Sequence, residues 1–373
     1  MGKLYQHILE FIQCQSKFRS FETTQVFLSF DIDILHSAAD KLRCLELFEY
    51  SNTYCRHDDL IFMDDTKSDA ICKLICNQKN LENVCLAFGD LLLNETSLQL
   101  ISKALYTQAS SLRAFGISSA NANVWGIVSF GQYTNLQFVL LHRCKLFSLH
   151  PLQLDAFSRL RGLKLVDVCV NSNSICALLG SVKECLDHLF VGFYTEDVLN
   201  ENWYTEIWKT CATNTPHLVE LSISLKVISH HIPIIQAALP LWQHLRNLSV
   251  LCAETAKILP DDYFKETSTL LLLLGRNMPK SVKSFTLSGH CSQYPEELVT
   301  FLAICSTSLE SLNLSGQYIS DEVINALLNH MGHSLKSVQI QMNKAYLSDE
   351  VKLIVMKNKI VVHNFLSMKI LKA

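Results

Sequence analysis

A short apolar pattern recurs along this chain and limits what the chain can fold into. In each copy an apolar residue is followed three and five positions later by two more, as in Leu309-x-x-Leu312-x-Leu314. Such regular self-similarity is typical of repeat proteins, in which each unit buries its apolar face against its neighbours. The copies are 24 to 39 residues apart, and they begin at residues 42, 81, 112, 136, 160, 186, 218, 245, 282, 309 and 335.

Each copy predicts a strand that is followed by a helix. The second half of the pattern alternates apolar and other residues, as expected of a strand with one buried face. The clearest helical stretch is residues 320–331, where Val323, Ile324, Leu327 and Leu328 fall on one face. Parallel strands need a crossover of this kind, so the pattern predicts parallel pairing between successive copies.

We therefore expect an α/β solenoid that forms a single domain over residues 1–373, with eleven to twelve irregular repeats. A degraded copy at Phe18, Phe21 and Thr23 is the twelfth, so residues 1–41 are interpreted as a worn N-terminal repeat. Its apolar end is expected to be only partly shielded. Residues 335–373 are expected to hold the C-terminal repeat and a cap.

Nearly the same hexamer occurs twice, YISDEV at residues 318–323 and YLSDEV at 346–351. It could be a ligand motif used in duplicate, or the same structural point in two repeats. Each copy follows a run of the apolar pattern, which favours the second interpretation. Ser320 and Ser348 are expected to cap a helix N-terminus, and the Asp-Glu pairs place negative charge at its positive end. The preceding Ile319 and Leu347 are expected to anchor the loop in the core.

The pattern resembles the leucine-rich-repeat family over nearly the whole chain. Residues 136–146 match the family motif L-x-x-L-x-L-x-x-[NC]-x-L throughout, with Cys144 at the Asn/Cys position, which Asn343 occupies in a later copy. Among the repeat subtypes, the sequence most resembles the cysteine-containing subtype found C-terminal to F-box motifs. The resemblance implies a curved horseshoe with parallel strands on the concave side and helices on the convex side.

Through this resemblance the expected function is protein binding, as the substrate-recognition part of an SCF-type (cullin) ubiquitin ligase. The Leu-Pro-x-Glu-like opening of an F-box is not found in this sequence. A ligase adaptor is therefore expected as a partner if an F-box exists upstream. The alternative is a repeat scaffold or inhibitor without a ligase connection, and a remoter one is a fragment of an immune sensor.

The composition of the chain limits which class of partner it is expected to bind and in which cell compartment it is expected to lie. The formal net charge is −3 and no Lys/Arg run occurs, so we expect no nucleic-acid partner. The longest apolar run, residues 270–274, is far below the roughly 20 residues that a membrane span needs, and no signal peptide is recognised. The 14 cysteines are therefore expected to be reduced thiols in a cytoplasmic or nuclear protein.

We expect no enzyme activity, cofactor or metal. No phosphate-binding glycine loop, G-x-S-x-G nucleophile motif or C-x-x-C pair occurs in the sequence. Cys72 and Cys76 lie on an apolar helix, which favours core packing over metal binding. The dense polar cluster of residues 55–59 with Asp64 and Asp65, within an acidic loop at 51–70, could hold a divalent cation, but a solvated loop is expected. Solvated positions without a metal ion are likewise expected for His230, His231, His330 and His333.

The third, fifth and seventh residues of each repeat should face away from the core. The family resemblance implies that they line the concave face, which is the family's usual binding surface. In the last copies they are small and polar, as expected of a solvated sheet face: Ser284, Thr286, Ser288, Ser311, Asn313, Ser315, Ser337, Gln339 and Gln341. In the middle copies they are apolar or basic, and we predict that they bind a protein partner: Phe138, Leu140, His142, Lys164, Val166, His188 and Phe190. The histidines predict binding that changes between about pH 5 and 8. The alternative is that a loop or the 199–217 segment covers these residues.

Overall fold

The computed structural model describes residues 20–24, 42–48, 65–88, 93–119, 133–146, 155–195, 201–224, 232–252, 261–289, 295–305, 309–315, 319–331, 334–342 and 361–364. The chain forms two compact units. The first comprises Met1–Cys185 with Phe193–Val198, and the second comprises Leu186–Gly192 with Leu199–Ala373.

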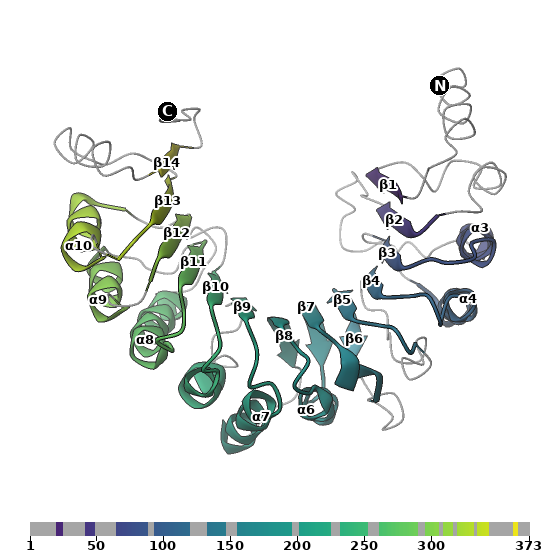
Figure 1. Cartoon of the computed structure of the whole chain (residues 1–373), viewed down its shortest axis with the longest axis horizontal. Coiled ribbons are helices and arrows are strands. Elements are labelled where there is room, and N and C mark those ends of the chain that lie inside the picture. Colours follow the sequence, from purple (N-terminus) through teal and green to yellow (C-terminus); the bar gives the residue numbers. More distant parts are fainter. Residues whose placement is uncertain are drawn as a thin grey trace. The chain divides into compact units, whose positions relative to one another are not determined.

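Parallel strands follow one another in chain order within each unit (Figure 1). In the first unit they are β1 (Ser20–Thr24), β2 (Cys44–Phe48), β3 (Asn83–Ala87), β4 (Ala114–Ser118), β5 (Phe138–His142) and β7 (Gly162–Val170), with the short β6 (Lys145–Leu146) paired to β7. Strand β8 (His188–Thr195) is divided between the units. The second unit continues with β9 (Glu220–Ser224), β10 (Asn247–Leu251), β11 (Ser284–Ser288), β12 (Ser311–Ser315), β13 (Ser337–Met342) and β14 (Val361–Asn364).

Helices connect most of the strands and lie along one side of them in each unit (Figure 1). The first unit has α3 (Asp65–Cys76), α4 (Glu95–Tyr106), the 3-10 helix η4 (Asp155–Arg159) and α6 (Ser172–Ser181). The second has α7 (Glu201–Asn214), η6 (Ile234–Ala238), η7 (Leu239–Leu241), α8 (Asp261–Asn277), α9 (Pro295–Cys305) and α10 (Asp321–Met331). This strand–helix repeat confirms the predicted α/β leucine-rich-repeat solenoid.

Burial follows the predicted alternation along the strands. The two inner residues of each strand pair in register with those of the next, as Leu163 does with Val139 and Leu312 with Phe285. Where their burial is described, these inner side chains are at most 9 % exposed, and the residues between them are half-buried or exposed apart from the buried Gly116. Within each unit, these strands therefore each add two residues to the apolar core, and a register shift by one residue would expose them.

One backbone carbonyl in almost every repeat holds two amides of the next strand. The carbonyl of Arg43 accepts from the amides of Glu82 (2.8 Å) and Asn83 (3.0 Å). Both lone pairs of the oxygen are thus used, and the start of each strand is aligned with the last. The same pattern recurs at the carbonyls of Glu82, Arg113, Gln137, Asp187, Val219, Arg246, Lys283 and Glu310.

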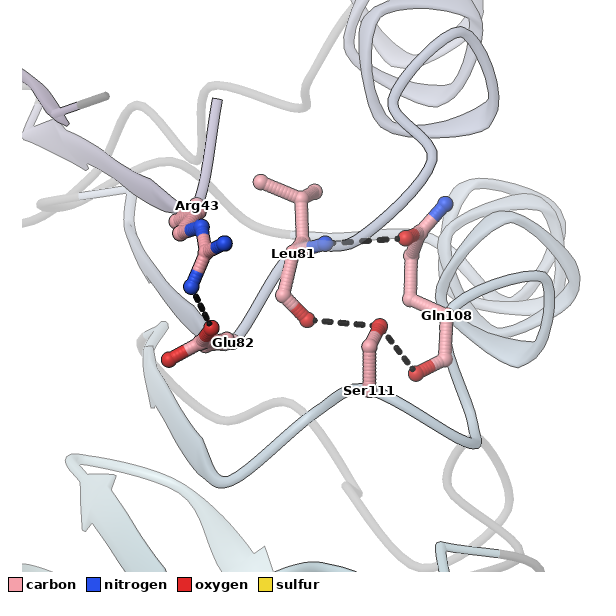
Figure 2. Close-up of polar contacts among 5 residues, drawn as sticks. All are labelled: Arg43, Leu81, Glu82, Gln108 and Ser111. Atoms are coloured by element: carbon pink, nitrogen blue, oxygen red, sulfur yellow. Dashed lines mark hydrogen bonds and ion pairs between the residues drawn. The ribbon is translucent and has the colours of Figure 1, made fainter. Parts of the chain in front are cut away.

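Buried glutamines tie helices to neighbouring repeats in the first unit. Gln108 Oε1 accepts from the amide of Leu81 (3.1 Å), and its Nε2 donates to the carbonyls of Ile75 (3.1 Å) and Gln78 (2.7 Å). Figure 2 shows the contact with Leu81 beside the Ser111 hydroxyl, which donates to the carbonyl of Leu81 (2.9 Å). Such buried polar groups are tolerated because each finds a partner.

Two ends of the predicted repeat series can be compared with the strands. In β1, Phe21 and Thr23 pair with Leu45 and Leu47, so the degraded copy does form a strand in register. Strand β14 was not predicted from the sequence. It pairs with β13, and Val362 lies opposite Ile340. The sequence carries Lys357 where the first apolar residue of this copy would stand, so the pattern is lost there. Residues 1–19 and 25–41 lie outside the described part.

A regular α-helix does not follow every strand, which corrects the expectation. The connection from β9 to β10 contains the π-helix η6 and the 3-10 helix η7. Pro233 precedes η6 and Pro240 lies within η7. A proline lacks the amide that an α-helix needs in its interior, so the helix changes its hydrogen-bonding pattern at this point.

The helix predicted after the first hexamer begins as expected, at Asp321, with two acidic residues in its first turn. Ile319 is buried, as are the predicted core residues except Leu328, which is half-buried. The predicted side-chain cap is wrong: Ser320 Oγ is buried and has no hydrogen-bond partner among the described residues, while the Ser320 carbonyl accepts from the Ile324 amide (3.2 Å). The second hexamer lies outside the described residues.

Side-chain caps do occur at two asparagines that the repeat pattern does not mark. Asn94 Oδ1 accepts from the Ser97 amide (2.7 Å) before α4, and Asn171 Oδ1 accepts from the Ser174 amide (2.8 Å) before α6. Asparagine is among the strongest N-cap residues.

Ten described cysteines are free thiols, but Cys252 is disulfide-bonded, so the expectation of fully reduced cysteines is wrong at this residue. Whether two cysteines meet depends on their separation in the folded chain, which composition does not reveal. Burial raises the pKa of Cys72, Cys144, Cys211 and Cys305 to about 12, so these thiols stay protonated and act as small apolar side chains.

Among the described helices, none has the length and hydrophobicity to cross a membrane.

Replacing Gln108 by Ala should lower the free energy of unfolding by about 2–3 kcal/mol, because the buried Leu81 amide loses its acceptor. Urea unfolding measures the change. Gln243 is exposed and donates once, to the Pro240 carbonyl, so Gln243→Ala should stay within about 0.5 kcal/mol of the wild type. Equal losses of unfolding free energy in the two variants would contradict a role for Gln108 in connecting neighbouring repeats.

Gly289 follows β11 with φ of 80°, a conformation that residues with a Cβ adopt at a cost. Gly289→Ala should destabilise the chain by about 1–2 kcal/mol. In the control Gly180→Ala, the added Cβ meets nothing within 4 Å on helix α6, so stability should rise by up to about 1 kcal/mol. Thermal unfolding of both variants checks the opposite signs, and a gain at both positions would contradict the left-handed turn.

Candidate functional site

A cluster of outward side chains on β4, β5 and β7 stands out in the first unit. Phe138 is 43 % exposed, and it is the strand residue among the five large hydrophobic residues most exposed in the described part of the chain. The other four, Tyr106, Trp203, Leu241 and Ile304, lie on helical segments. Among the strand side chains whose burial is described, the exposed aromatic ring therefore lies on β5.

A glycine on the next strand makes room for the Phe138 ring. Phe138 pairs in register with Gly162, and a Cβ on Gly162 would lie 2.5 Å from Cδ1 of the ring. On the other side of β5, Leu140 pairs with Gly116, where a Cβ would lie 3.5 Å from Leu140 Cδ2. Gly162 thus allows the Phe138 ring to lie against bare backbone, a position that a side chain on β7 would otherwise occupy. At Gly116 the added Cβ would be in ordinary contact with Leu140, and its close neighbour would be Cys85 Sγ at 2.9 Å.

His142 and its neighbours close the far end of β5. Nδ1 of His142 lies 2.9 Å from Ser118 Oγ, so the imidazole is tethered to β4. The Cys144 thiol donates to the carbonyl of His142 (3.1 Å) and to that of Ile117 (3.7 Å) in the preceding repeat. Cys144, at the Asn/Cys position of the motif, thus fixes the backbone that follows β5 through these two hydrogen bonds.

Five of the seven predicted binding residues come together in this unit. Leu140 pairs with Lys164 and His142 with Val166, so these four residues and Phe138 occupy adjacent positions on β5 and β7. Lys164 is exposed, and Leu140, His142 and Val166 are half-buried. We call this set of five residues the β5–β7 face.

The other two predicted residues belong to the second unit. His188 Nδ1 lies 3.3 Å from Glu220 Oε2, and both side chains are about half exposed. Phe190 is half-buried and pairs with Ser222. Helix α7, which forms most of the 199–217 segment, packs against η6 and η7 and lies with the helices, not over the strands (Figure 1).

A cationic flank around the β5–β7 face was missed at the level of sequence. Residues 112–119, 136–146 and 160–170 carry a single acidic side chain, Asp167, against five basic ones: Arg113, Arg143, Lys145, Arg161 and Lys164. Four of the five are exposed and Lys145 is half-buried. The signal was present in the second residue of the repeat pattern, which is Arg at both 113 and 161.

The outward face of β11 to β13 is small and polar, as predicted. Its side chains bond to one another: Ser337 Oγ donates to Ser311 Oγ (2.9 Å), and Ser315 Oγ donates to Asn313 Oδ1 (2.9 Å). Beside it, Lys336 and Lys283 lie 2.6 and 3.5 Å from the Glu310 carboxylate. The hydrogen bond from Lys336 and its charge lower the pKa of Glu310 below its usual range. These contacts leave no exposed apolar side chain on the described part of that face.

The described residues contain no group of three or more His, Cys, Asp or Glu side chains arranged to hold a metal ion. Cys72 is buried, as predicted for core packing, whereas Cys76 is exposed, so its predicted place in the core is wrong. Cys76 lies in the last turn of α3, at a helix position that faces solvent. His330 is exposed, as expected; the acidic cluster at 55–59 with Asp64, and His230, His231 and His333, lie outside the described residues.

Comparisons with known proteins give structural neighbours alone. No family model and no curated protein sequence matches the chain. It is similar to the leucine-rich-repeat protein LegL7 of Legionella pneumophila, with 12% identity, coverage of 87% of this chain and 93% of that one, and a TM-score of 0.41. It is also similar to an internalin of Listeria monocytogenes (14% identity, 81% and 75% coverage, TM-score 0.36) and to TLR13 in its complex with ssRNA13 (14% identity, 90% and 40% coverage, TM-score 0.42).

Gly162→Ala should displace the Phe138 ring, because the new methyl group would occupy the place of Cδ1. The ring can turn outward, so the loss of stability should be on the order of 0.5–1.5 kcal/mol. Urea unfolding of Gly162→Ala in the wild type and in Phe138→Ala measures how much of the loss comes from the ring. The loss should largely vanish without the ring, and an equal loss in both backgrounds would contradict the contact.

Proposed function

We propose that this chain is a protein-binding leucine-rich-repeat module whose partner docks on the outward strand residues. The observation that carries the proposal is the exposed Phe138 ring, which lies against Gly162 on the sheet, with basic residues in the same three repeats. The contact residues would be Phe138, Leu140, His142, Lys164 and Val166 in the first unit, and His188 and Phe190 in the second.

The energetics of burial support this choice of residues. Covering a large apolar side chain with a partner stabilises a complex by roughly 1.5–3 kcal/mol. Aromatic anchors near the centre of a contact commonly dominate binding energy. Phe138 has the most to gain, because its neighbours Leu140 and Val166 are already half-buried and complete the apolar surface around it. The chemistry of this face supplies contacts for recognition, and binding rather than catalysis is the function it supports.

The finer proposal is substrate recognition in an SCF-type ubiquitin ligase, with the chain in the cytoplasm or nucleus. It rests on the match of residues 136–146 to the cysteine-containing repeat subtype and on the role of Cys144, whose thiol bonds to two backbone carbonyls. The second candidate is a scaffold or inhibitor with no ligase connection, which the same binding face would serve equally well.

Replacing Phe138 and Phe190 by Ser should weaken partner binding at least tenfold and leave the fold intact, because no inner strand residue is changed. Isothermal titration with a partner obtained by affinity purification measures binding, and circular dichroism checks folding. The matched control is Tyr106→Ser with Trp203→Ser, which removes one exposed aromatic residue from a helix of each unit. Unfolding of the first variant, or equal loss of binding in both, would count against the proposed face.

Co-purification with the cullin-bound ligase adaptor separates the two candidates. The protein, expressed from its complete natural coding sequence, should retain the adaptor if the finer proposal holds. A chain that binds its partner normally but never retains the adaptor would remove the ligase assignment and leave the scaffold or inhibitor.

A further inference from the structure

The β5–β7 face carries positive charge at both ends and in its middle. The strand register places Ala114, Phe138 and Gly162 side by side. Arg113 immediately precedes β4, and Arg161 immediately precedes β7. Lys164 pairs with Leu140 at the middle of the face, and Arg143 follows His142 at the far end. The cations therefore frame the apolar residues along the whole strand.

This local charge opposes the charge of the chain. The whole protein has a formal net charge of −3, yet the three strand segments around the face hold five basic side chains and one acidic one. Glu82, which precedes the neighbouring strand β3, forms an ion pair with Arg43 at 2.7 Å that compensates its charge. Charges farther away than about 8 Å are largely screened at physiological salt, so a ligand on this face experiences the local excess. Such concentration of one sign on one face selects the opposite sign in a partner.

We infer that the partner of the β5–β7 face is an acidic protein segment that carries apolar side chains, an inference that rests on the proposed function. Carboxylates of the segment would meet Arg113 and Arg161 at one end, Lys164 in the middle and Arg143 at the other end. Its apolar side chains would cover Phe138, Leu140 and Val166. From Gln137 to Arg143 the strand spans roughly 20 Å, so about six residues of an extended segment match the face.

A nucleic acid fits this face less well than an acidic segment. A phosphate backbone gains from cations but gains nothing from the half-buried Leu140 and Val166 at the centre. Single strands are bound by successive aromatic platforms on which bases stack, and this face offers one exposed ring, Phe138, beside the half-buried imidazole of His142, which is held by Ser118. An acidic segment uses both the cations and the apolar side chains.

Selection from a random peptide library tests the inference even though the partner is unidentified. Phage that display random 12-residue peptides are selected on the full chain and counter-selected on its Phe138→Ser variant. Enriched peptides should carry a net negative charge and at least two large apolar residues. Enriched peptides that are neutral or basic would overturn the acidic partner while the proposed binding face stands, and the absence of any enrichment over the variant would overturn both.

Charge-reversed variants of the full chain then locate the contacts. A synthetic peptide of the enriched sequence should bind Arg113→Glu/Lys164→Glu at least tenfold more weakly than the wild type, and its affinity should fall as salt rises. Lys73→Glu/Lys103→Glu makes the same change of charge on exposed positions of helices α3 and α4, so binding should change less than twofold. Equal weakening in both variants would overturn the inference, as would displacement of the peptide by a 12-nucleotide single-stranded RNA at lower concentration than by the unlabelled peptide.

Discussion

The carbonyl that accepts two amides of the following strand is the contact on which the rest of this structure depends. It recurs at the second residue of the repeat pattern in both units, and it aligns each strand with its predecessor before the strand begins. That alignment places the inner residues in continuous buried rows, such as Val139 beside Leu163. Because each repeat contacts only its neighbouring repeats, the stability of the fold accumulates from one such strand-to-strand contact to the next.

The same alignment decides which residues are available for binding. Every second strand residue must face away from the core, and the last repeats place small polar residues there, which bond to one another as Ser311 and Ser337 do. Strand β5 departs from this pattern with Phe138 and Leu140, and the neighbouring strand β7 accommodates the Phe138 ring with Gly162. The ring and the glycine belong to different repeats, so the departure involves two consecutive strands.

The sequence predicted the parts that depend on periodic burial. Strand positions, parallel pairing and the outward residues follow from alternation, and even the degraded β1 pairs in register at Phe21. Features set by single contacts were not predictable: Ser320 lies at a helix start yet forms no cap, and the buried Gln108 looks like any surface glutamine in the sequence. The cationic flank was not predictable from the net charge of the whole chain, because it depends on which basic residues adjacent strands bring together.

Site-specific photocrosslinking in living cells tests most directly whether the outward face of β5 binds a protein. p-Benzoylphenylalanine is placed at Phe138 in one chain and at Tyr106 on helix α4 in another, two exposed aromatic positions of the same unit. The account predicts that illumination links a discrete protein to the chain labelled at position 138 and none to the chain labelled at 106. Crosslinking to the same proteins from both positions, or none from position 138, would contradict it.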